Sequence, residues 1–203
     1  SPRIERDGRV IETDTRKAVA LLTYLAVTDE YQSRDTLAAL LWPEMNEERA
    51  RAALRRTLSS LRAAVGEQAI TVTRDGLSIN QDECWCDTIA FEAATNEPHR
   101  HTHDGPPCDD CLQKMESAVS LYRDHFLSGF SLRDSAEFDD WQLAVTEHLR
   151  RTYGTALAWL VQVYSQSGEL AKAIDLGRRW LAVDPLREEA HRWLMQLYAW
   201  QGA

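Results

Sequence analysis

One stretch of the chain gathers arginine side chains with no acidic residue among them. Between Arg49 and Arg62, in RARAALRRTLSSLR, there are five arginines and no Asp or Glu. A guanidinium group donates paired hydrogen bonds to phosphate oxygens or to the O6 and N7 edge of guanine. The stretch therefore predicts contacts to double-stranded DNA, provided that one element presents these side chains together.

A single helix from Glu47 to Val65, stopped by Gly66, would do so. At about 100° per residue, four apolar side chains form one buried stripe. They are Leu54, Leu58, Leu61 and Val65. The far side holds Ala52, Arg56, Ser59 and Ala63, and one flank holds Arg51, Arg55 and Arg62. Short side chains permit close approach to a groove, so the candidate DNA contacts are Arg51, Arg55, Arg56, Ser59 and Arg62. The alternative is an amphipathic helix whose arginines are merely solvated.

A β-hairpin is expected directly after this helix. The β-rich runs ITVT and LSIN flank Arg74-Asp75-Gly76, and Asp-Gly is a strong hairpin signal. Arg74 at the tip could reach a phosphate or the minor groove beside the helix, and it joins the candidate DNA contacts.

A second group of chemically active residues lies near the middle of the chain. In HRHTHDGPPCDDC, the side chains of His101, His103, Cys108 and Cys111 could supply four zinc ligands. The spacing is not that of a standard zinc finger, however. We therefore prefer a polar loop whose second cysteine begins a helix, and we expect neither a metal site nor a cofactor.

Composition and motifs narrow the function further. The chain has 203 residues and a net charge of −9, which argues against a surface that binds nucleic acid everywhere. No GxSxG, HExxH, GxGxxG or GxxxxGK[ST] motif is present, so we expect no enzymatic activity.

The apolar runs are too short to cross a bilayer, and the closely spaced cysteines suit a reducing compartment, so we expect a cytoplasmic protein. The start lacks Met and a signal segment, which suggests a piece of a longer protein.

Residues that interrupt helices and strands divide the chain into two predicted domains. A segment rich in Pro and His, residues 96–107, predicts a linker between a domain at 1–95 and another at 108–203. In the first, a short strand near Gly8 and helices at Thr15 to Val27 and after Ser33 precede the arginine helix and the hairpin. Three helices followed by a hairpin outline a winged helix.

The second domain is expected to be all helical, so that the chain as a whole is mostly α. Helical periodicity resumes at Cys108 and continues almost to the end, with breaks at Gly129, Gly168, Pro185 and Gly202. Within Ala158 to Pro185, the spacing of small and aromatic residues is that of a tetratricopeptide-like repeat, a pair of packed helices. The helix from Glu188 to Trp200 would begin the next repeat.

Several of these segments together resemble a known family. RKAVALLTYLAV, SRDTLAALLWPE, ARAALRRTLSSLRAAVG and the hairpin are similar to the OmpR-type winged-helix DNA-binding domain of antibiotic regulatory protein (SARP) and AfsR-like transcriptional regulators. AVSLYRDHFLSGF, Phe138 with Trp141, and DPLREEAHRWLMQLYAWQG resemble the bacterial transcriptional activator domain that follows it.

The resemblance implies a function. It makes the helix through Arg55 and Arg62 the recognition helix and the hairpin the wing, in a sequence-specific activator of transcription. It also implies contact with RNA polymerase, tandem protomers on direct repeats, and further modules beyond Ala203. The alternative from another class is a protein-interaction or scaffold module of a larger signalling ATPase, in which the winged helix does not bind DNA. Steep salt dependence of DNA binding would distinguish the two.

Overall fold

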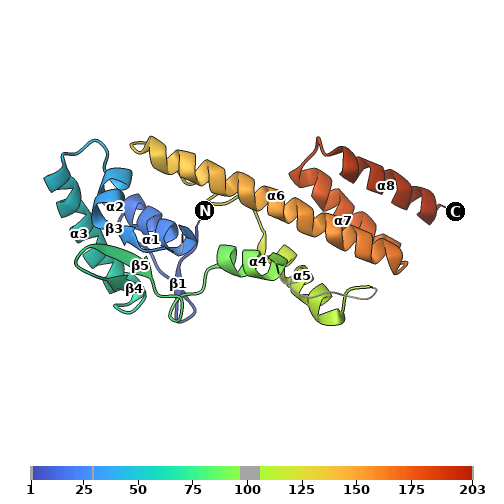
Figure 1. The fold of residues 1–203 in the computed structure, drawn as a ribbon, viewed down its shortest axis with the longest axis horizontal. Coiled ribbons are helices and arrows are strands. Elements are labelled where there is room, and N and C mark those ends of the chain that lie inside the picture. The colour runs from blue at the N-terminus through green and yellow to red at the C-terminus, as the bar shows by residue number, and fades with distance from the viewer. Residues whose placement is uncertain (1, 29, 97–105, 203) are drawn as a thin grey trace. The chain divides into compact units, whose positions relative to one another are not determined.

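The computed structural model describes residues 2–28, 30–96 and 106–202 (Figure 1). It is mostly helical, as predicted, with small antiparallel sheets in the N-terminal part. The chain forms two compact units, each described here by itself. The first comprises Ser1–Cys86 with Phe126–Val145, and the second comprises Asp87–His125 with Thr146–Ala203.

Three helices form the frame of the first unit. They are α1 (Arg16–Thr28), α2 (Arg34–Leu41) and α3 (Glu47–Val65). Ser33 caps α2, because its hydroxyl accepts a hydrogen bond from the Thr36 amide, and Asn46 caps α3 through the Arg49 amide. Gly66 ends α3 with a φ of 111°, a conformation that side chains disfavour. The predicted bounds of α3 are confirmed.

Two antiparallel sheets complete the first unit. A ribbon is formed by β1 (Glu5–Arg6) and β2 (Arg9–Val10). The second sheet has the order β3-β5-β4 and contains β3 (Gln32–Ser33), β4 (Ile70–Val72) and β5 (Gly76–Ile79). The last two strands are the predicted hairpin. The prediction missed β3, because a strand of two residues exists only through its pairing with β5, which is distant in sequence.

The approach of β3 to β5 requires a glycine. A Cβ atom on Gly76 would overlap the backbone oxygen of Gln32 and the ring of Tyr31. We expect Gly76→Ala to destabilise the first unit by about 1–3 kcal/mol, because backbone must move to admit the methyl group. Urea denaturation with amide exchange of β5 measures this loss. Gly154→Ala is the control, since its methyl group would lie at an ordinary contact distance, 3.4 Å from Trp180 Nε1, and an equal loss there would contradict the steric explanation.

The core of the first unit includes a segment from much later in the chain. Phe138 is fully buried in the cluster built by α1, α2 and α3, together with Leu127, Phe130 and Leu132. Polar contacts join the same segments. Lys17 Nζ lies 2.7 Å from Asp134 Oδ2, and the Ser135 hydroxyl donates a 2.5 Å hydrogen bond to the Leu40 carbonyl. Residues after the predicted linker therefore complete the N-terminal unit.

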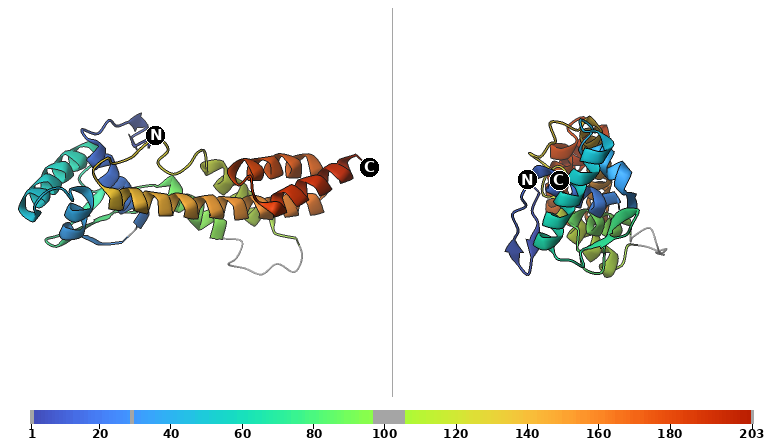
Figure 2. Two further views of the ribbon diagram at one scale, coloured as in Figure 1. Left: turned by 90° about the horizontal axis from the view of Figure 1, so that it is seen from above. Right: turned by 90° about the vertical axis from the view of Figure 1, so that its left-hand side faces the viewer.

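The second unit is all helical, as predicted. It contains α4 (Asp87–Asn96), α5 (Asp109–Leu121), the later part of α6 (Ala136–Gln166), α7 (Leu170–Val183) and α8 (Glu188–Gln201). Figures 1 and 2 show α7 and α8 side by side. Their close approach depends on Gly177, where a Cβ atom would lie 2.8 Å from Leu194 Cδ2.

The predicted repeat is a pair of helices, α6 and α7. They are joined at Gly168, whose φ is 79°, and Pro185 follows the end of α7. The residues that set the repeat pattern are buried: Leu160, Tyr164, Ala173 and Trp180. The helix pair and its core positions are confirmed.

Two parts of the chain differ from the sequence-based expectation. Asp87–Asn96 forms α4 and belongs to the second unit, whereas the sequence predicts a first domain that extends to residue 95. Residues 122–135 interrupt the helical pattern, and Leu127 takes a φ of 51°. Leu127, Phe130 and Leu132 of this segment lie in the core of the first unit, and the chain reaches these positions through turns and not through a helix. Most of the predicted linker, residues 97–105, lies outside the described residues, so the linker stays a prediction.

Within the described ranges, no helix combines the length and the apolar character needed to cross a membrane.

Candidate nucleic-acid interface

The arginine-rich helix α3 is anchored by one apolar face. Leu54, Leu58 and Leu61 are buried, as predicted, and Ala50 and Ala53 are buried beside them. Residues of α1 and α2 pack against α3. The opposite side of α3 is consequently fixed toward solvent.

The structure divides the predicted contact residues into two groups. Arg55, Arg56 and Ser59 are exposed, whereas Arg51 and Arg62 are half-buried. Among the residues that the structure describes, neither Arg55 nor Arg56 forms an ion pair. The middle of α3 thus presents two guanidinium groups and a hydroxyl to solvent.

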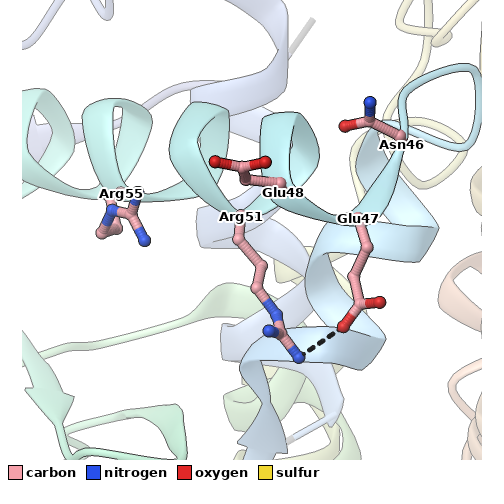
Figure 3. Close-up of a pocket in the computed structure, with 5 residues that line it drawn as sticks. All are labelled: Asn46, Glu47, Glu48, Arg51 and Arg55. Atoms are coloured by element: carbon pink, nitrogen blue, oxygen red, sulfur yellow. Dashed lines mark ion pairs between the residues drawn. The ribbon is translucent and has the colours of Figure 1, made fainter.

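Arg51 is held by two carboxylates of its own chain. Its Nε lies 2.6 Å and its Nη2 2.8 Å from the two oxygens of Asp35 on α2. Nη2 also lies 2.7 Å from Glu47 Oε1, one turn earlier on α3 (Figure 3). The hydrogen bond from Arg51 lowers the pKa of Asp35, and the same bond raises the pKa of Arg51. Both groups therefore stay ionised at neutral pH.

A shallow open depression lies at this end of α3 (Figure 3). It is lined by Asn46, Glu47, Glu48, Arg51 and Arg55. Both signs of charge meet there, and the Glu48 carboxylate points away from the Arg51 guanidinium (Figure 3). All five lining side chains are polar or charged, unlike the mostly apolar and aromatic linings of pockets that hold small organic ligands.

Arg62 is held in a similar way at the other end of α3. Its Nη2 forms an ion pair with the Glu67 carboxylate and donates a 3.1 Å hydrogen bond to the Glu67 carbonyl. The Nε of Arg62 is buried without a hydrogen-bond partner among the described residues. Sequence reasoning missed both sets of partners, because neither Asp35 nor Glu67 lies inside the arginine stretch.

The tip of the β4–β5 hairpin is braced from outside the hairpin. Arg74 is exposed there, next to Thr73. The Thr73 hydroxyl lies 2.8 Å from the Tyr31 hydroxyl, and Arg34 Nη2 donates a 3.0 Å hydrogen bond to the Thr73 carbonyl. The sequence analysis did not predict that Tyr31 and Arg34 would contact the hairpin. The position of Arg34, directly after the residue that caps α2, was the one feature of the sequence that could have indicated this contact. The hairpin thus presents Arg74 on a fixed turn.

The structure describes only two of the four candidate metal ligands, Cys108 and Cys111, and their side chains are in contact. His101 and His103 lie outside the described residues. Cys111 is buried, and burial with the neighbouring Cys108 raises the pKa of its thiol, which disfavours the thiolate that zinc requires. No group of three or more His, Cys, Asp or Glu side chains suited to a metal occurs in the described part of the chain.

Comparison with solved structures gives a similar fold. Mycobacterium tuberculosis EmbR, in a structure titled as its complex with a low affinity phosphopeptide, matches with a TM-score of 0.50 at 18% identity. The match covers 97% of this chain and 62% of the EmbR chain, so this chain spans less than two thirds of that protein. No curated protein sequence matches the chain.

Comparison with family models identifies the larger part of the chain. The model of the bacterial transcriptional activator domain matches residues 86–203. The match begins at the boundary where the first unit gives way to α4, and it includes the whole of the second unit. Together with the EmbR-like fold, this match shows that the chain belongs to the family of regulators with a bacterial transcriptional activator domain.

Proposed function

We propose that this chain is a sequence-specific DNA-binding regulator that activates transcription. Its first unit would act as a winged helix, with α3 in the major groove and the β4–β5 hairpin as the wing. The observation that supports this most directly is the exposed pair Arg55 and Arg56, beside Ser59, on a helix whose other face is buried.

The chemistry of these side chains suits the major groove. An arginine fork fits the O6 and N7 edge of guanine or a phosphate, and a serine hydroxyl can donate or accept. Arg51 and Arg62, on the same flank of α3 as Arg55, would lie nearer the backbone of the duplex. The net charge of −9 confines favourable contact to this local surface.

The braced hairpin supports a second point of contact. Because Tyr31 and Arg34 hold Thr73, the adjacent Arg74 can reach a phosphate or the minor groove at a small cost in conformational freedom.

Two protein partners belong to this proposal. An activator must contact RNA polymerase, and a second protomer on a direct repeat would increase the affinity through effective concentration. Membership of an activator family supports the first of these partners.

Selection from a random duplex DNA pool at two salt concentrations tests the proposal. We expect enrichment of a repeated motif, with retention that falls steeply as salt rises, because each phosphate contact releases counterions. Sequencing of the retained DNA would identify the operator.

Absence of binding at low salt would contradict the proposal. It would favour the alternative, a protein-interaction or scaffold module in which the winged helix does not bind DNA. A helix-groove contact with a protein need not weaken steeply with salt.

A further inference from the structure

Arg51 differs from the exposed arginines of α3 because most of its donors are already used. A guanidinium group has five N–H donors. Nε and Nη2 supply hydrogen bonds to both oxygens of Asp35, and Nη2 also meets Glu47 Oε1. Only the two hydrogens on Nη1 are left for a further acceptor.

These contacts are open to competition. The side chains of Arg51, Asp35 and Glu47 are 43%, 64% and 74% exposed, so water and ions reach all three. Exposed ion pairs contribute little net stability, because solvent screens them. The two unesterified oxygens of a DNA phosphate can accept the same pair of guanidinium hydrogen bonds as the Asp35 carboxylate and can replace it at small cost.

We propose that Asp35 and Glu47 form a carboxylate clamp on Arg51, which competes with DNA phosphate for its guanidinium and so lowers the sequence-independent affinity of this chain for duplex DNA. The clamp rests on the proposed function. The clamp prevents a phosphate contact that a duplex of any base sequence could make. The exposed middle of α3 is left to distinguish bases. Affinity for random DNA falls as a result, while the discrimination supplied by Arg55 and Arg56 remains.

Asp35→Asn tests the clamp, because it removes the charge and one of the two acceptor oxygens. The measurement is fluorescence anisotropy of the full chain with a labelled random-sequence duplex over a range of KCl concentrations. We expect binding to tighten by about five- to tenfold near 0.1 M salt, with a salt slope steeper by about 0.9, the value for one added phosphate contact. The gain should vanish when Arg51→Ala is combined with Asp35→Asn.

Glu48→Gln is the matched control. It removes one carboxylate from the same turn of α3, but Glu48 points away from Arg51 (Figure 3). Glu48→Gln should leave the salt slope of DNA binding unchanged. Any change that it causes in affinity should be the same in the presence and in the absence of the Arg51 side chain.

Each outcome decides the matter. If Asp35→Asn leaves binding unchanged, or if its gain persists without Arg51, the clamp is overturned while DNA binding by the parent chain stands. If neither the parent chain nor any variant binds the duplex at low salt, the proposed function itself fails, and the clamp fails with it.

Discussion

Phe138→Ala is expected to destabilise the first unit by about 3–5 kcal/mol, although Phe138 lies within the segment that matches the activator-domain family. Phe138 is fully buried, with ring centroids 5.2 Å from Trp141 and 6.2 Å from Phe130. Removing the ring leaves a cavity in the core that also holds α1, α2 and α3. A loss of this size is a large share of the stability of an ordinary domain.

Amide hydrogen exchange in α1 and α3, together with urea denaturation of the full chain, would measure this loss. Amide exchange shows whether the loss of stability is in the first unit. A single unfolding curve that averages over both units would not show this. Leu143→Ala is the control, because Leu143 is on the same helix but 62% exposed, and its substitution should change stability by no more than about 0.5 kcal/mol. Equal effects of the two substitutions would show that the segment Phe126–Val145 is not part of this core.

The sequence was most informative where local signals and burial agree. Local signals set the helix ends: the cap at Ser33, the break at Pro43 and the glycine after α3. Each lies within one turn of the helix whose end it determines. The apolar period then identified the buried face of α3, and with it the face that carries Arg55, Arg56 and Ser59. These are short-range effects, which one sequence records directly.

The rest depends on contacts between distant residues. Phe138 joins a core whose helices α1, α2 and α3 lie far earlier in the chain, and β3 exists only because it pairs with β5. The ion pairs of Arg51 also depend on a distant residue. Glu47 is one turn away on α3, but Asp35 is on another helix. A charge pattern along α3 can show that five arginines are close together, but not which of them already hold a carboxylate.

The double variant Arg55→Ala/Arg56→Ala is expected to have the largest effect on DNA binding. Both side chains are exposed, Arg56 on the side of α3 opposite its buried leucines and Arg55 on the adjoining flank. Each should contribute about 1–3 kcal/mol if it contacts a base, so the pair should weaken binding to the selected operator by at least about 2 kcal/mol. Neighbouring residues can couple, and the single variants measure how far the two losses add.

Arg62→Ala gives a comparison within α3, since its guanidinium is already engaged by Glu67, and its removal should weaken binding less than removal of Arg55. Arg123→Ala is the control for charge alone, because Arg123 is an exposed arginine of the second unit. Anisotropy titrations with operator and random duplexes separate the two kinds of contact. Loss of a base contact weakens operator binding more than random binding, whereas loss of a phosphate contact weakens both alike and reduces the salt slope. If the double variant behaves like Arg123→Ala on both duplexes, the exposed middle of α3 does not contact DNA, and the recognition surface must lie elsewhere in the chain.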